Sequence, residues 1–467
     1  MPLLVSAAIA AFYVLALVLD RSAGIVYGVL VLLGIVGALA GRRVHDQSFL
    51  YVIRRYWPLS LALAGPLLAD AAHQLATGNF YGRSLDQAAR LALFPFVFFA
   101  VWLAPLKYLQ HLQWAFVLGA FGATIKIYVL TQGGKVQYGT DFIPIGIFAE
   151  MAMLVGLYAA YSIAWRAQES RLAVLLKLLA CCAVVYAAYL SHERGVWLTF
   201  IAFGAIAFGF ISHLDWRRKT LILVLVLAGA ILALEGDTRV RQRFERAWHE
   251  VEMYRQGKDV DTSIGVRLQL WRGSLILFRE NPVFGVGAGE YRAALNGLMA
   301  RKIISPAAAE HPHSHNEILF AMAKFGLLGL AAVLALYLVP GYYFLRAMRS
   351  RERKVRATAC MGLSLCLGFM VLGMTDVLFL WWEVFPFYAL SIALFTACIA
   401  KLNAPLGPEG RGAHGAASRF EFERAPNAYF LARACRYLRY QRRPCRISPR
   451  FIAKREISRI SLGWRGA

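Results

Sequence analysis

The chain has 467 residues, of which 59% are hydrophobic and only 17% are charged. A soluble domain usually carries roughly a quarter charged residues, so this composition excludes an ordinary soluble protein. The formal net charge is +24. The basic residues lie mainly between long apolar runs, where Lys and Arg orient membrane proteins, so this charge does not require a nucleic-acid partner.

Apolar runs of about 20 residues recur along the chain, which is the length that an α-helix needs to cross a bilayer. The sequence therefore predicts an all-α polytopic membrane protein with about twelve spans. The first nine spans are expected within residues 1–235 and the last three within residues 316–400. The expected spans are residues 3–19, 22–41, 57–77, 88–106, 109–130, 142–164, 172–190, 195–213, 220–235, 316–345, 357–380 and 381–400.

Alternate loops between the expected spans are rich in Lys and Arg, which marks the cytoplasmic side. With the N-terminus inside, the inner loops hold Arg42, Arg43, Arg54, Arg55, Lys107, Arg166, Arg171, Arg217, Arg218, Lys219 and the basic run 346–356. The short outer loops hold only Arg21, Arg83, Lys135 and Arg194. This asymmetry predicts that both termini are cytoplasmic and that the long loop 236–315, between the ninth and tenth spans, lies outside the cytoplasm.

The long loop is expected to be partly helical. Residues 238–256 and 267–280 each place apolar side chains near one helical face, with arginines that include Arg239 and Arg243 beside them. The loop contains no cysteine, so it shows no disulfide framework and no cysteine zinc site. Residues 401–467 read as a basic cytoplasmic tail that contacts anionic membrane lipids.

Three polar clusters are predicted on the outer face, where polar groups next to a bilayer are functional candidates. The first is "SHERG" at 191–195, in which Arg194 offers a planar fork of donors that suits a phosphate or diphosphate. The second is Arg267, which follows Gly265 at the start of an expected helix, a position that favours anions. Each arginine could instead be an ordinary interfacial or surface residue.

The third cluster is "HPHSHN" at 311–316, where the long loop re-enters the membrane. Ser314 or Asn316 is expected to cap the next helix, which places three histidines near its N-terminal end. A helix N-terminus favours the neutral imidazole, which can act as a general base. The histidines could also be polar filler or bind a transition metal; no carboxylate or cysteine joins them in the sequence, so we predict no metal site.

Together and in this order, the clusters resemble the O-antigen ligase/polymerase superfamily of membrane glycosyltransferases. The resemblance rests on His-Ser-His-Asn at 313–316 followed by Leu319, Gly326 and Gly329, on the segment from Arg267 through Trp271 into "NPVFGVGAGEY", and on the Arg-Gly pair at 194–195. Within that superfamily the chain most resembles the O-antigen ligases of Gram-negative bacteria, which are similar to GT-C-type enzymes.

The resemblance implies a metal-independent, cofactor-free enzyme of lipopolysaccharide biosynthesis in the bacterial inner membrane, with a periplasmic active site. Its partners would be a preassembled glycan on undecaprenyl diphosphate and a sugar hydroxyl of lipid A–core, joined with inversion at the anomeric carbon. The implied roles are a general base at His315 or His313; diphosphate contacts at Arg194, Arg267 and Lys135; positioning by Asn316 and Gln137; and acceptor binding by Arg239 and Arg243.

Three other functions remain open on the sequence. An O-antigen polymerase and a protein O-oligosaccharyltransferase of the same superfamily would share the Arg/His chemistry. A transporter for a lipid-linked glycan would instead show internal inverted repeats and broken mid-membrane helices. The sequence shows neither of these two features and gathers its polar residues at one face, which favours an enzyme.

Overall fold

A computed structural model of the chain describes residues 1–44, 46–136, 140, 142–210 and 248–404. Within these ranges every regular element is a helix. The N-terminal half contains α1 (Pro2–Leu15), α2 (Ser22–Leu39), α3 (Phe49–Arg55), α4 (Trp57–Thr77), α5 (Gly82–Ala92), α6 (Phe94–Leu103), α7 (Leu106–His111), α8 (Gln113–Leu130), α9 (Ile145–Tyr161), the 3-10 turn η1 (Ser162–Trp165), α10 (Arg171–Ser191) and α11 (Arg194–Phe210). The C-terminal half contains α14 (Ser263–Glu280), α15 (Tyr291–Ala300), α16 (Pro306–Ala309), α17 (Glu317–Ala347), α18 (Arg353–Leu372) and α19 (Val384–Leu402).

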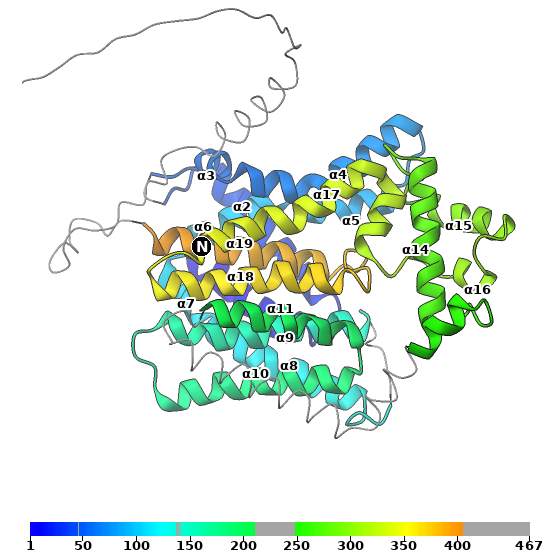
Figure 1. The fold of residues 1–467 in the computed structure, drawn as a ribbon. Helices are drawn as coiled ribbons and strands as arrows, with labels where there is room; N and C mark the ends of the chain where they lie inside the picture. The colour runs from blue at the N-terminus through cyan, green and yellow to red at the C-terminus, as the bar shows by residue number, and fades with distance from the viewer. Residues whose placement is uncertain (45, 137–139, 141, 211–247, 405–467) are drawn as a thin grey trace, which may run out of the picture. The chain divides into compact units, whose positions relative to one another are not determined.

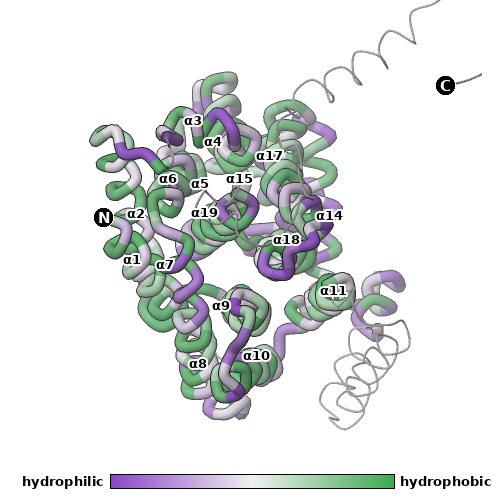
Figure 2. Tube along the Cα trace, turned by 90° about the vertical axis from the view of Figure 1, so that its left-hand side faces the viewer, coloured by the Kyte–Doolittle hydropathy of each residue, from purple (hydrophilic) through white to green (hydrophobic). Residues whose placement is uncertain are grey.

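The long helices lie side by side in one bundle (Figure 1), and hydrophobic residues predominate along them (Figure 2). In the described part of the chain, 8 helical segments are long and apolar enough to cross a membrane. They are Ser22–Leu39, Gly82–Leu103, Leu106–Leu130, Ile145–Trp165, Arg171–Ser191, Glu317–Ala347, Arg353–Leu372 and Val384–Leu402. Helices α1 and α11 are apolar but shorter. The predicted all-α polytopic membrane fold is therefore confirmed, whereas the expected span 220–235 lies outside the described residues.

The connection between the last two helices differs from the prediction. The sequence indicated spans at 357–380 and 381–400 with a short aromatic turn between them, but α18 ends at Leu372 and α19 begins at Val384. The intervening segment 373–383 is a loop. Most of its residues are apolar, so hydropathy alone assigns it to the span. This loop brings Asp376 to the histidine cluster, as described below.

Helix α14 stands across one end of the bundle, with α15 and α16 beyond it (Figure 1). Leu270 and Leu277 of α14, Tyr291 and Leu295 of α15 and Phe320 of α17 belong to a second apolar core, separate from that of the bundle. The predicted helix 267–280 is thus present and begins slightly earlier. Of the predicted helix 238–256, residues 248–256 are described, and 248–255 of these are helical.

Helix α17 is broken at Gly326, whose φ of 61° and ψ of −142° are not helical. Residues 282–287, from the "NPVFGVGAGEY" segment, fill the break: the Val286 N–H donates to Ala323 O at 2.9 Å and the Gly287 N–H to Lys324 O at 2.8 Å. A Cβ at position 326 would lie 2.4 Å from Val283 O, so this close approach requires glycine.

The sequence showed no sign of this break, which lies nine residues after the start of α17. Hydropathy does not register a single residue with positive φ inside an apolar run. The break binds the extramembrane loop to α17 through backbone hydrogen bonds, and this contact fixes the loop next to the histidines.

Candidate active site

The histidine cluster lies in a tight turn that leads directly into α17. Asn316 is the N-cap residue, and its Oδ1 accepts a hydrogen bond from the Leu319 N–H at 3.0 Å, as the sequence predicted for one of two candidate caps. His315 adopts a φ of +51°, a left-handed conformation that costs energy for a residue with a Cβ. Such strain persists only where surrounding contacts impose it, and it is often found at functional sites.

The three histidine rings are close together. His315 Nε2 lies 3.4 Å from His311 Nδ1, and the His313 and His315 ring centroids are 4.4 Å apart. His313 is buried, whereas His311 and His315 are partly exposed. The His315 backbone N–H also donates to His313 Nδ1 at 3.3 Å, which orients the His313 ring. The ring of His315 is therefore the more accessible of the two candidate bases.

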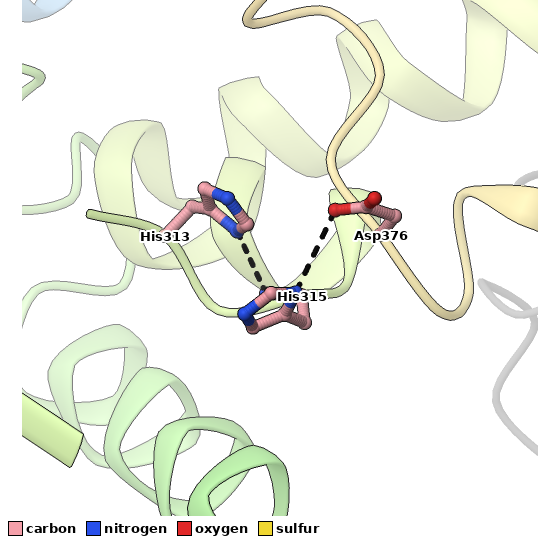
Figure 3. A group of neighbouring side chains, drawn as sticks. All are labelled: His313, His315 and Asp376. Atoms are coloured by element: carbon pink, nitrogen blue, oxygen red, sulfur yellow. Dashed lines mark hydrogen bonds and ion pairs between the residues drawn. The ribbon is translucent and has the colours of Figure 1, made fainter. Parts of the chain in front are cut away.

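Asp376 completes this cluster, although the sequence analysis did not identify it. Its Oδ1 lies 3.6 Å from His315 Nδ1, and His315 lies between His313 and Asp376 (Figure 3). The same oxygen accepts a hydrogen bond from the Val377 N–H at 2.8 Å. The expectation that no carboxylate joins the histidines was thus wrong, because the loop 373–383 had been assigned to a span. An acidic residue within an apparent span was the available signal, since such residues are rarely without function.

Arg267 of α14 is near enough to this cluster to act on it electrostatically. Thr262 caps the helix by accepting a hydrogen bond from the Gly265 N–H, so Arg267 lies in the second turn and is half-buried. Its positive charge is close enough to His311 and His313 to disfavour a second positive charge on either ring. The structure therefore brings Arg267 together with the predicted histidines, which are distant from it in sequence.

The environment keeps two histidines neutral and the carboxylate ionised. Burial, followed by the neighbouring His315, lowers the pKa of His313 to about 4. Burial also lowers the pKa of His311. Burial acts to raise the pKa of Asp376, but the interactions with His315 and with the Val377 N–H outweigh it and lower that pKa. The site thus presents neutral imidazole next to a carboxylate and an arginine.

Arg194 is the first residue of α11, and its side chain lies outside the described part of the structure. Its neighbour Gly195 packs against the loop that carries Asp376: a Cβ there would lie 2.5 Å from Thr375 Oγ1 and 2.9 Å from Leu372 Cδ1. A side chain at position 195 would require Thr375 and Leu372 to move, so glycine allows the closest approach here. The start of α11 therefore lies next to the histidine–aspartate cluster.

The remaining predicted residues lie away from the histidines, are engaged in other contacts or lie outside the described part of the structure. Lys135 is exposed on a turn whose Gly134 O lies 3.3 Å from His192 Nε2, near the end of α10. No contact between Lys135 and the histidine cluster is present in the described residues. Asn316 donates from Nδ2 to Met374 O at 3.1 Å, so its side chain is engaged in holding two segments together. Gln137, Arg239 and Arg243 lie outside the described residues.

His313, His315 and Asp376 are also the residues that could hold a metal ion. One ligand atom from each lies within 4.8 Å of the others, and two imidazoles with one carboxylate suit Zn²⁺ or a similar transition metal. Arg267 beside them adds a positive charge that opposes a cation. The predicted absence of a metal remains a prediction, and a chelator can test it.

Comparisons with known proteins show which of these residues lie in a region similar to other proteins. The family model described as "O-Antigen ligase" matches residues 178–334, a region that contains Arg194, Arg267, His313 and His315. A protein named O-antigen ligase from Escherichia coli K12 is 28% identical over 261 residues, which cover 55% of this chain and 58% of that protein. The chain is thus similar to O-antigen ligases over the matched regions.

A second relative of this chain is an uncharacterized protein from Haemophilus influenzae Rd. It is 24% identical over 176 residues, which cover 37% of this chain and 44% of the relative. The chain thus matches only about half the length of these two curated relatives. Asp376 lies beyond the region matched by the O-antigen ligase family model.

Proposed function

We propose that this protein is an O-antigen ligase of the bacterial inner membrane. It transfers a preassembled glycan from undecaprenyl diphosphate to a sugar hydroxyl of lipid A–core at the periplasmic face. The observation that carries the proposal is the convergence of His315, Asp376 and Arg267 at the start of α17, two of them within the matched ligase region.

The proposed reaction is a single displacement at the anomeric carbon. The acceptor oxygen forms a bond to that carbon as the carbon–oxygen bond to the diphosphate breaks, and the electron pair stays on the diphosphate. His315 Nε2 takes the proton from the acceptor hydroxyl. Because the acceptor attacks the face opposite the leaving diphosphate, the anomeric configuration inverts. Asp376 holds His315 from its Nδ1 side and stabilises the imidazolium that forms.

Charge grows on the leaving diphosphate during this step, and the proposed contacts neutralise it. Arg267 is placed next to the histidines and is half-buried, where a charge-assisted contact is stronger than in water. Arg194 and Lys135 are proposed as further diphosphate contacts, and His313 as a second candidate base. Gln137 is proposed to position the substrate, and Arg239 and Arg243 to bind the acceptor.

Purified protein supplied with a polyprenyl diphosphate glycan and lipid A–core tests this proposal. We expect ligated lipid A–core, with no loss when a chelator is present. Longer polyprenyl-linked chains without ligated core would indicate a polymerase, and glycan on a protein serine or threonine would indicate a protein O-oligosaccharyltransferase. Loss of product with the chelator would show that the histidine–aspartate cluster works with a metal.

A further inference from the structure

Glu317 joins the two segments that form the candidate active site. It is the first residue of α17 and is 6% exposed. Its Oε2 accepts hydrogen bonds from two successive backbone N–H groups of the loop 373–383, Leu378 at 2.6 Å and Phe379 at 3.0 Å. A carboxylate that accepts two backbone donors makes stronger bonds than a neutral acceptor would.

Two further hydrogen bonds connect the same segments on the other side of Asp376. The Glu317 backbone N–H donates to Gly373 O at 2.7 Å, and Asn316 Nδ2 donates to Met374 O at 3.1 Å. The four bonds thus attach the loop at residues that precede and follow Asp376. Because His315 is separated from Glu317 by a single residue, these bonds also determine how far His315 lies from Asp376.

We propose that Glu317 is a positioning residue that holds the Asp376 loop against the histidine turn and so maintains the contact between Asp376 and His315. Only the catalytic consequence of this proposal rests on the proposed function. The hydrogen bonds themselves can be tested without any glycan transfer.

Glu317 has a second possible role, which the test must separate from the first. It lines a cavity of about 80 Å³ together with Asp70 and Lys324, and the charge on Lys324 acts on it. Asp376 is also close enough to act on it electrostatically. If Glu317 served mainly as a counter-charge for Lys324, removing its negative charge would have a larger effect than shortening its side chain.

Two conservative variants distinguish reach from charge. Glu317→Gln removes the charge but keeps an oxygen at the same place, whereas Glu317→Asp keeps the charge and withdraws the oxygens by one methylene. The control is Glu290→Ala. Glu290 is an exposed glutamate in the extramembrane segment that precedes α17, and its side chain makes no capping hydrogen bond. Both variants keep a polar side chain of similar size at the first residue of α17. We therefore expect both to fold and to be purified like the wild type.

The first measurement is hydrogen–deuterium exchange of the full-length protein, read by mass spectrometry on peptides that contain Leu378 and Phe379. We expect Glu317→Asp to speed exchange of each of these two amides about fivefold, because each amide loses one hydrogen bond worth roughly 1 kcal/mol. Exchange in Glu290→Ala should match the wild type within about twofold, and exchange in Glu317→Gln, which keeps the oxygen but loses the charge, should lie between the wild type and Glu317→Asp. Faster exchange in Glu317→Gln than in Glu317→Asp, or no change in Glu317→Asp, would overturn the proposal.

The second measurement is glycan transfer. Glu317→Asp should lower kcat by about 10- to 100-fold with an unchanged KM for the donor, since a small misplacement of a catalytic group has effects of this size. Asp376→Asn should lower kcat much less in the Glu317→Asp variant than in the wild type, because the contact between Asp376 and His315 is already disrupted in that variant. Additive losses would contradict the positioning role. A wild type that transfers no glycan would overturn the proposed function, and the exchange result would still decide the role of Glu317.

Discussion

Buried charges occur at both ends of the helical bundle, and they are arranged differently. At the end away from α14, Lys177 Nζ lies 3.0 Å from Glu169 and 2.8 Å from the Gln113 side-chain oxygen. Lys401 Nζ donates to Trp102 O at 2.6 Å and also to Ala104 O. The side chains of Lys177 and Glu169 are 0% and 5% exposed. This end satisfies its charges with fixed partners inside the protein.

At the end next to α14 the charges are close together but incompletely paired. His315 and Asp376 remain partly exposed and lie 3.6 Å apart, slightly beyond hydrogen-bond distance. Arg267 is close to the histidines, and no carboxylate within ion-pair distance of it is present in the described residues. Donors and acceptors that remain available at a protein surface can bind a substrate. This difference is the one expected if one end stabilises the fold and the other, as proposed, carries out the transfer.

The largest expected effect is on the transfer reaction at His315. His315→Ala should lower transfer by about 1,000-fold, within the range that a general base contributes, and should leave the thermal unfolding temperature nearly unchanged. His111→Ala is the control. His111 is exposed and is the last residue of α7, so it lies at the opposite end of α8 from the turn that carries Lys135. Equal activity of the two variants would remove His315 from the mechanism.

At the end of the bundle away from α14, we expect a substitution to lower stability and to leave transfer unchanged. Lys177→Met should lower the free energy of unfolding by about 3 kcal/mol, because it leaves Glu169 buried with only Arg166, 3.7 Å away, as an ion-pair partner. Transfer per folded molecule should be unchanged. Thermal unfolding in detergent, compared with exposed Lys107→Met, measures this effect. A loss of activity without a loss of stability would contradict the structural role.

Arg267 and Arg272 provide a matched comparison on one helix. Arg267→Ala should lower transfer by about 100-fold, the size expected when one donor to a developing negative charge is removed. Arg272→Ala should change it less than about twofold, because Arg272 is exposed and outside the candidate site. Transfer rates with a fixed polyprenyl diphosphate glycan test both variants. Similar rates for the two would show that general basic charge, rather than the position of Arg267, matters.

The smallest expected effect is the pH dependence that arises from His313. Its pKa is lowered to about 4 in the folded state, so between pH 6.5 and 4 the unfolded chain binds more protons at this residue than the folded protein does. Stability from this residue is therefore present above pH 6.5 and decreases as the pH falls. At pH 5 the loss should be on the order of 2 kcal/mol. His313→Gln should show a smaller decrease in unfolding temperature between pH 7 and 5, and an unchanged decrease would contradict this origin.

The sequence was sufficient for most of the helical architecture, because apolar runs long enough to span a bilayer are distinctive. It also singled out Arg267, His313 and His315, which lie near one another in the structure, and it offered Asn316 as one of two candidate caps. It could not place Asp376, since the apolar loop 373–383 is indistinguishable by hydropathy from the end of a span. It also missed the break at Gly326, which depends on hydrogen bonds to a segment about 40 residues earlier.

Contacts between distant segments account for both errors. The loop 282–287 stabilises the break in α17 only because the fold brings it there, and Glu317 fixes the Asp376 loop in the same way. No local propensity encodes such a contact.

The most direct test of the difference between the two ends is photo-crosslinking with a light-activated polyprenyl diphosphate analogue, followed by identification of the labelled peptides. We predict labelling within residues 263–280 and 311–317, with competition by unlabelled polyprenyl diphosphate. Competed labelling near Glu169, Lys177 and Lys401, with none at the start of α17, would contradict the assignment of the active site.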